Sequence, residues 1–240
     1  MELAYTLVFT VFPYLCLTTF VVGHGYRYVT DRYHWNARSS EFLEIKSLFY
    51  GAVLFHWGIV LTFLGHAGGL LMPQKYFDLA GIDSQTHLAI AYGAGLAAGL
   101  AAFAGALLLL RRRLTHPRVQ AVGTLNDTIT IGGLVFVIGV GFYNVVFGHY
   151  NVLYTVAPWI RGIVTFTPDA TLMRAVPLSY KIHVLSALAL LGFSPFSRLV
   201  HIWSVPVFYF FRRWIVFRQL PYSAPRDITA EYLKPGREEG

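Results

Sequence analysis

The sequence predicts an all-α integral membrane protein, a bundle of five transmembrane helices, from three observations. Hydrophobic residues make up 55% of the 240 residues and charged residues only 13%, against about 25% charged in an ordinary soluble domain. Most basic residues lie in short clusters between apolar runs. Five of these runs are long enough to cross a bilayer, which takes about 20 residues. They cover about 4 to 23, 48 to 72, 87 to 110, 128 to 148 and 178 to 210.

The first run is expected to be a transmembrane helix of the mature protein. It begins at Met1 and Glu2 with no Lys or Arg before it, whereas a secretory signal starts with a positively charged segment. The single cysteine, Cys16, lies inside this run. One cysteine supports neither a disulfide framework nor a cysteine-ligated cluster, so any metal must be held by other side chains.

The positions of the basic residues predict the orientation of the helices. Segments rich in Lys and Arg next to transmembrane helices stay on the cytoplasmic side. We therefore expect an outer N-terminus, a cytoplasmic C-terminus and outer loops at about 73 to 86 and 149 to 177. The same signal accounts for the net charge of +7 without nucleic acid as a partner. The expected cytoplasmic residues include Arg27, Arg32, Arg38, Lys46, Arg111, Arg112, Arg113, Arg118, Arg212, Arg213 and Arg218.

Local signals predict where the later helices begin, bend and end. Asn126 and Asp127 are expected to cap the fourth helix, because their side chains can accept from its first N–H groups. Pro195 should kink or break the fifth run, since proline removes a helical hydrogen bond. Residues 1–220 should form the membrane domain, and residues 221–240 should form an extended cytoplasmic tail.

Four histidines lie inside the apolar runs, His56 and His66 in the second and His183 and His201 in the fifth. An ionisable side chain within a membrane span is costly, so each of these histidines indicates a functional site. The structural alternative is hydrogen bonding between helices by neutral imidazole, worth only about 1 kcal/mol per contact. The other five lie at helix ends, in loops or near the interface: His24, His34, His87, His116 and His149.

The spacing of these histidines predicts two haem sites. Because the second and fifth helices are antiparallel, His56 should oppose His201 on the cytoplasmic side, and His66 should oppose His183 on the outer side. Separations of ten and eighteen residues correspond to about 15 and 27 Å along a helix, so tilt and the Pro195 break must absorb the difference. The sequence has no C-x-x-C-H motif for covalent attachment, which predicts two non-covalent haem b groups.

Glycine and arginine residues fit around such groups. Gly58, Gly65, Gly68 and Gly69 flank the second-helix histidines and would let a macrocycle approach, although plain helix packing explains them equally well. Haem propionates need cationic partners. The best candidate is Arg198, three residues before His201, and the next are Arg112 and Arg113 at the end of the third helix.

These stretches resemble the gamma subunit, a cytochrome b, of membrane-bound respiratory nitrate reductase. The resemblance rests on SPFSRLVHIWSVP from Ser194 to Pro206, LFHWGIVLTFLGHAGGLLMP around His56 and His66, YKIHVLSALALLGF around His183, and RRRLTHPRV. It covers about residues 1 to 220. It implies a multi-pass protein of a bacterial or archaeal cytoplasmic membrane that oxidises quinol near the outer haem. Electrons then pass through both haems to an iron–sulfur subunit and a molybdenum subunit on the cytoplasmic side.

The resemblance also implies the site residues. The matching iron ligands are the same four histidines, paired as above. The quinol pocket of the family lies beside the ligand matching His66 and includes a basic residue entering the third helix, which is a Lys in some members. Here His87 takes that place, so Gly65, His66, Gly69 and His87 are expected to bind menaquinol or ubiquinol, with His87 as a hydrogen-bond partner or proton acceptor.

Other functions remain open at this point. The chain could be the cytochrome b of a formate dehydrogenase, a hydrogenase or a complex of sulfur metabolism. It could also be a transporter whose histidines relay protons, although it lacks the intramembrane carboxylates expected in a proton path. A haem-free membrane anchor is a third alternative.

Overall fold

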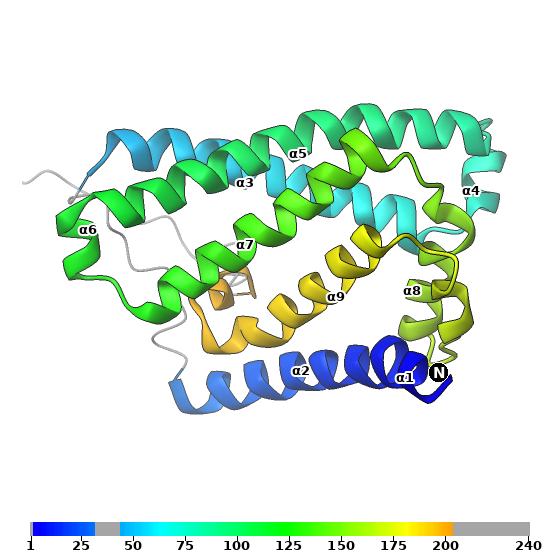
Figure 1. Ribbon diagram of the computed structural model, residues 1–240, viewed down its shortest axis with the longest axis horizontal. Helices are drawn as coiled ribbons and strands as arrows, with labels where there is room; N and C mark the ends of the chain where they lie inside the picture. Colours follow the sequence, from blue (N-terminus) through cyan, green and yellow to red (C-terminus); the bar gives the residue numbers. More distant parts are fainter. Residues whose placement is uncertain (1, 32–43, 204–240) are drawn as a thin grey trace, which may run out of the picture. The chain divides into compact units, whose positions relative to one another are not determined.

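The computed structural model describes residues 2–31 and 44–203, which lie within the compact unit Met1–Ser204, and every regular element among them is a helix (Figure 1). The all-α prediction is therefore confirmed. Four helices in this part of the chain are long and apolar enough to cross a membrane, and they match the first four predicted runs. They are Glu2–Asp31, Lys46–Leu71, Ser84–Thr115 and Leu125–Gly148.

The first span consists of α1 (Glu2–Thr6), a π-helical turn η1 (Leu7–Val11) and α2 (Phe12–Asp31). It packs along α9 (Leu178–Phe193). In Figure 1, α2, α5 and α9 run in one direction while α3 and α7 run in the other. The second and fifth predicted runs are thus antiparallel, as the pairing of the histidines requires.

The second span, α3 (Lys46–His66), continues into a π-helical turn η4 (Ala67–Leu71) and packs closely against α5 (Ser84–Thr115). A Cβ atom at Gly58 would lie 2.3 Å from the backbone N of Ala102, and one at Gly105 would lie 2.3 Å from the backbone N of Phe55. No side chain fits at these distances. Gly58 therefore lets the two helix backbones touch, whereas a Cβ at Gly65 or Gly68 would have no atom within 4 Å.

The fourth span, α7 (Leu125–Tyr143), begins with a capping box, and the predicted caps are wrong by two to three residues. Thr124 is the cap, because its side chain accepts from the backbone N of Asp127 at 3.3 Å. The Asp127 carboxylate in turn accepts from the backbone N of Thr124 at 2.9 Å. An acidic residue at the third helical position can thus be mistaken for the cap in the sequence. Its carboxylate instead accepts from the backbone N–H of the true cap, three residues earlier.

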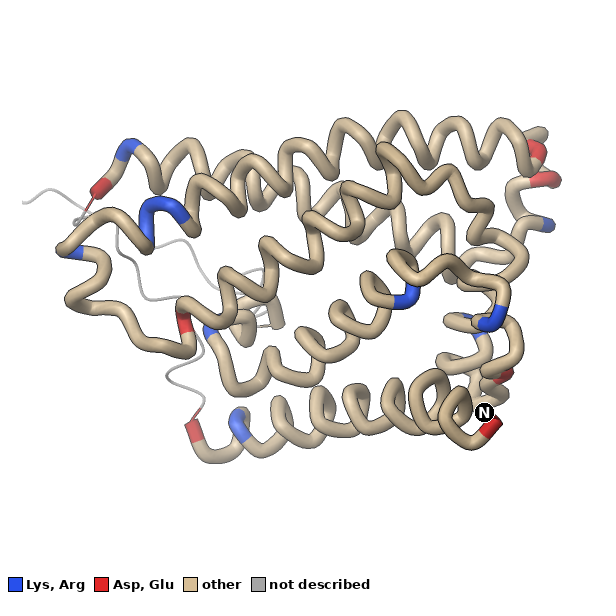
Figure 2. Tube along the Cα trace, viewed as in Figure 1, with Lys and Arg blue, Asp and Glu red and all other residues tan. Residues whose placement is uncertain are grey.

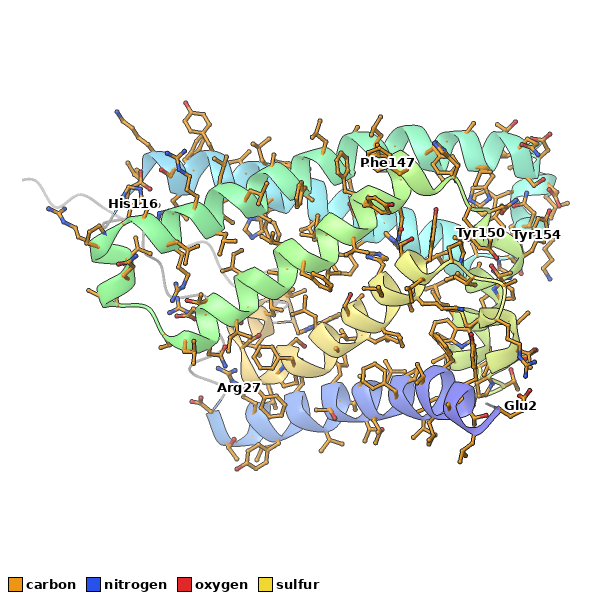
Figure 3. The ribbon with its side chains drawn as sticks, in the orientation of Figure 1. Glu2, Arg27, His116, Phe147, Tyr150 and Tyr154 are labelled. Carbon is orange, nitrogen blue, oxygen red and sulfur yellow. The ribbon has the colours of Figure 1, made fainter. Side chains whose placement is uncertain are left out.

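The fifth run is broken at Pro195, which confirms that prediction. The 16-residue α9 ends at Phe193, and two 3₁₀ segments follow, η8 (Ser194–Phe196) and η9 (Arg198–Trp203). Arg27 of α2, labelled in Figure 3, donates to the carbonyl oxygens of Pro195 at 2.7 Å and Ser197 at 3.2 Å. This side chain satisfies carbonyls that the break releases from the helix. Residues 204–210, the end of the predicted fifth span, and the 221–240 tail lie outside the described residues.

Residues 149–177, which were expected to be a loop, form a small helical cap with an apolar core. The cap contains η6 (Val152–Tyr154), the amphipathic helix α8 (Val156–Val164) and η7 (Ala170–Met173). Its buried Trp159 donates from Nε1 to the carbonyl oxygen of Phe9, in the π-helical turn of the first span, at 2.9 Å. The core residues are Phe9, Val156, Trp159, Ile163, Met173 and Val176.

Charge is distributed unequally between the two ends of the described helices (Figure 2). One end carries seven basic residues against three acidic ones, and the other end carries four of each. We call the first the basic end. Its charged residues are Arg27, Lys46, Arg111, Arg112, Arg113, Arg118 and Arg198 with Asp31, Glu44 and Asp127; the other end has Lys75, Arg161, Arg174 and Lys181 with Glu2, Asp78, Asp83 and Asp169.

Candidate functional site

The four intramembrane histidines lie in two pairs, one at the middle of α3 and one at its last residue. The ring centroids of His56 and His201 are 6.4 Å apart, and those of His66 and His183 are 6.1 Å apart. These are the two pairs expected from antiparallel helices. Along α3, His56 lies ten residues nearer than His66 to Lys46 at the basic end.

The Pro195 break explains how both pairs can form. On a straight helix His201 would lie five turns beyond His183, too far along the axis to meet His56. Instead α9 stops at Phe193, and Ser197 adopts an extended conformation with φ −123° and ψ 179°. The chain therefore leaves the α9 axis before His201, which sits on the short 3₁₀ segment η9.

Every one of the four imidazoles is held through Nδ1 by a backbone carbonyl oxygen. Such a contact makes Nδ1 the N–H donor of a neutral imidazole and leaves Nε2 as the atom with a free lone pair. A ligating histidine in a metal site is oriented in the same way. The four contacts are His56 with Ala52 at 2.7 Å, His66 with Thr62 at 2.7 Å, His183 with Val137 at 3.0 Å and His201 with Arg198 at 2.6 Å.

The pairs have the composition and spacing that a haem iron requires. Two metal–nitrogen bonds of about 2 Å each, together with the radii of two imidazole rings, place the ring centroids about 6 Å apart. No group of three or more His, Cys, Asp or Glu side chains that could hold a metal occurs within the searched ranges 2–31 and 44–203. A porphyrin supplies four nitrogens itself, so two protein ligands complete the site.

Close packing fixes the ring of His183. A Cβ atom at Gly141 of α7 would lie 2.6 Å from His183 Cε1 and 3.0 Å from Nδ1. Only glycine lets the imidazole lie this close to α7. The fourth span thus contributes a flat surface and a carbonyl acceptor, both of which orient an imidazole of the fifth run.

The three candidate propionate arginines are bound to two carboxylates at the basic end. Arg113 and Arg198 share Asp127, with the Nη2 atom of each 2.8 Å from Oδ2. Arg112 forms an ion pair with Glu44 at 2.9 Å. The backbone N–H of Ser47, with help from Arg112, lowers the pKa of Glu44 to about 2. Arg198 therefore does two things, since its carbonyl orients His201 and its guanidinium joins η9 to α7.

Of the four candidate quinol residues, the structure brings Gly69 and His87 together. A Cβ at Gly69 would lie 3.6 Å from His87 Nε2, and the His87 side chain is buried. His66 is exposed. It lies three residues before Gly69, where α3 continues into η4. Sequence reasoning missed Gln74 and Phe77 of α4 (Gln74–Leu79), which contact His87 directly. No sequence pattern distinguishes these contacts, because they depend on how α4 folds back onto α5.

The chain is similar to known proteins over most of its length. The family model described as "Nitrate reductase gamma subunit" matches residues 5–220. The chain is 40% identical to the nitrate reductase gamma chain of Bacillus subtilis over 213 residues, covering 87% of this chain and 96% of the relative. It is 33% identical to the respiratory nitrate reductase 1 gamma chain of Escherichia coli over 215 residues, covering 88% and 95%. It is also 37% identical over 229 residues to the nitrate reductase-like protein NarX of Mycobacterium tuberculosis, covering 92% of this chain and 35% of that protein.

Proposed function

This chain belongs to the nitrate reductase gamma subunit family, the membrane subunit of a respiratory oxidoreductase complex, and from that premise we propose how its residues carry electrons. Quinol is oxidised at the end of the bundle that holds His66 and His183. Electrons leave at the basic end, beside His56 and His201, toward iron–sulfur and molybdenum subunits. The observation that carries this proposal is the pair of neighbouring imidazoles at the middle of α3 together with the second pair at its last residue.

The four histidines are the residues that would hold two b haems, one between each pair. Bound there, haem supplies one-electron redox centres. The chain's own contribution is orientation: a backbone carbonyl accepts from each Nδ1–H, which leaves each Nε2 as the ring nitrogen that would bind the iron.

The charge distribution supports a cytoplasmic basic end. Seven basic against three acidic residues at this end agree with the rule that Lys and Arg stay on the cytoplasmic side. The N-terminus and the cap at residues 149–177 then face outward. Protons released on quinol oxidation at that end leave on the outer side, while electrons cross toward the cytoplasm.

The arginines at the basic end are suited to haem propionates. Arg113 and Arg198 both bind the carboxylate of Asp127, so two guanidinium groups lie together at this end. Guanidinium groups donate charge-assisted hydrogen bonds to carboxylates such as a propionate. Arg112, neutralised by Glu44, is the weaker candidate of the three.

The outer end has the features of a quinol site. The π-helical turn η4 directly follows His66, and such turns occur frequently at functional sites. Gly65 leaves open space, and Gly69 lies against His87. A quinol ring entering from lipid can therefore approach the His66 pair while a hydroxyl meets the His87 imidazole.

Replacing His87 with leucine should reduce quinol oxidation roughly a hundredfold, because positioned acid–base groups contribute about 10² to 10⁴ in rate. Haem content should not change, since His87 is not one of the paired imidazoles. The measurement is quinol-dependent nitrate reduction by the purified complex, with inhibitor binding by a quinol analogue. His149→Asn serves as the control, because it removes another imidazole at the same end and asparagine tolerates its φ of 43°. Normal turnover and unchanged inhibitor binding in His87→Leu would remove His87 from the site.

A further inference from the structure

The short helix α4 connects the end of the second span to the start of the third and lies against His87. Its first residue, Gln74, places Oε1 2.8 Å from His87 Nδ1. The ring of Phe77, one turn later, covers the imidazole with its centroid 4.0 Å away and tilted by 30°. His87 is thus held from one side by a polar contact and from its face by an aromatic ring.

The surroundings of Gln74 determine which end of its amide faces His87. Its NH₂ group donates to Asp78 Oδ1 at 2.9 Å and to the carbonyl oxygen of Ile82 at 3.2 Å. A backbone carbonyl can only accept, so the NH₂ group must face Ile82. The amide oxygen is therefore the atom that faces the imidazole, and the hydrogen-bond network assigns the orientation of the amide.

This orientation determines the tautomer of His87. Because Gln74 Oε1 can only accept, Nδ1 of the neutral ring must carry the proton. Nε2 is then the acceptor, and this atom faces Gly69, where a Cβ would lie 3.6 Å away. The lone pair of His87 is thus directed toward the helix end that follows His66.

We propose that Gln74 is a positioning residue for quinol oxidation: it fixes the His87 tautomer whose Nε2 accepts a hydrogen bond, and then the proton, from a quinol hydroxyl beside Gly69. This inference rests on the proposed quinol site. A hydroxyl donor suits an acceptor nitrogen, whereas the opposite tautomer would present an N–H group to the hydroxyl hydrogen. The electrons leave toward the haem site of the His66 pair, and the proton accepted by Nε2 then leaves for the outer side. The quinone that remains has only carbonyl acceptors, so against the neutral Nε2 it loses this contact and is released more readily.

Two variants separate this role from simple anchoring of α4. Gln74→Met keeps the length of the side chain but removes its acceptor. The double variant Gln74→Glu with Asp78→Asn keeps an acceptor oxygen for Nδ1–H, and the second change replaces the Asp78 carboxylate that would repel the new one. Lys75→Met is the matched control, because it removes a long polar side chain from the exposed face of the same helix.

The test measures kcat and KM for quinol-dependent nitrate reduction, quinol-analogue binding and the haem spectra of the purified complex. In Gln74→Met, kcat/KM and analogue affinity should each fall about tenfold, the loss of about one hydrogen bond. The haem spectra should not change, and the double variant should recover most of the loss. Gln74→Met turnover equal to the Lys75→Met control, or a double variant as impaired as Gln74→Met, would overturn the proposal. If His87→Leu is impaired while Gln74→Met is not, the quinol site stands without Gln74; if His87→Leu is normal, the quinol site itself fails.

Discussion

Replacing His201 with alanine is expected to stop electron delivery to nitrate while quinol still reduces the haem at the other end. The ring of His201 lies next to that of His56, and its Nδ1 is held by the carbonyl of Arg198 on a short 3₁₀ segment. Loss of one of two ligands should empty or alter that site without affecting the His66 pair. The measurement is an anaerobic spectrum of the complex after quinol addition and again after nitrate addition.

The matched variant at the other end should behave in the opposite way. His66→Ala removes a ligand beside the proposed quinol site, so quinol should no longer reduce either haem efficiently. Reduction by a small artificial donor followed by nitrate should still reoxidise the haem of the His56 pair. If His201→Ala blocked reduction by quinol as His66→Ala does, the assignment of the two ends would be wrong.

Replacing Gly105 with valine should prevent the bundle from assembling. A Cβ at this position would lie 2.3 Å from the backbone N of Phe55 and 2.8 Å from the carbonyl oxygen of Gly51. Because both contacts are backbone atoms, α3 and α5 must separate, at a cost above the usual 1–3 kcal/mol of overpacking. Since α3 carries His56 and His66, both histidine pairs should be disturbed.

The measurement is the yield and thermal unfolding of the detergent-solubilised chain, with haem absorbance per chain. Gly93→Val is the control, because Gly93 lies on the same helix and a Cβ there would have no atom within 4 Å. Both substitutions introduce the same β-branched residue into α5, so any intrinsic helix propensity cost is shared. A Gly105→Val protein as stable as the Gly93→Val protein would contradict the close contact of α3 and α5.

The sequence predicts well the features that depend on an apolar run of many residues or on a residue type that is rare inside such a run. Runs of about 20 apolar residues predict four helices that the structure contains. Histidines within such runs stand out because charged groups are costly there, and the expected opposition of His56 to His201 follows from the order of the helices alone. Pro195 predicts the break in the fifth run, since a proline within a helix has no N–H to donate.

The features that the sequence does not predict depend on local folding. Thr124 rather than Asn126 caps α7, because the chain turns two residues earlier than the polar cluster suggests. Gln74 contacts His87 only because α4 folds back at Pro73. The cap around Trp159 has a detectable signal, since Val156, Trp159 and Ile163 are spaced three and four residues apart on one helix face. Its partner, the carbonyl of Phe9, lies 150 residues away and has no sequence signal.

Haem stoichiometry is the decisive measurement for the four histidines. Two histidine pairs require two b haems per chain, one between each pair, bound without covalent attachment. A pyridine haemochrome assay on the purified complex, calibrated against the amount of this chain, should give two extractable b haems. His66→Ala and His201→Ala should each give one, with different parts of the reduced spectrum lost. One haem or none in the wild-type protein would contradict the assignment of the four histidines.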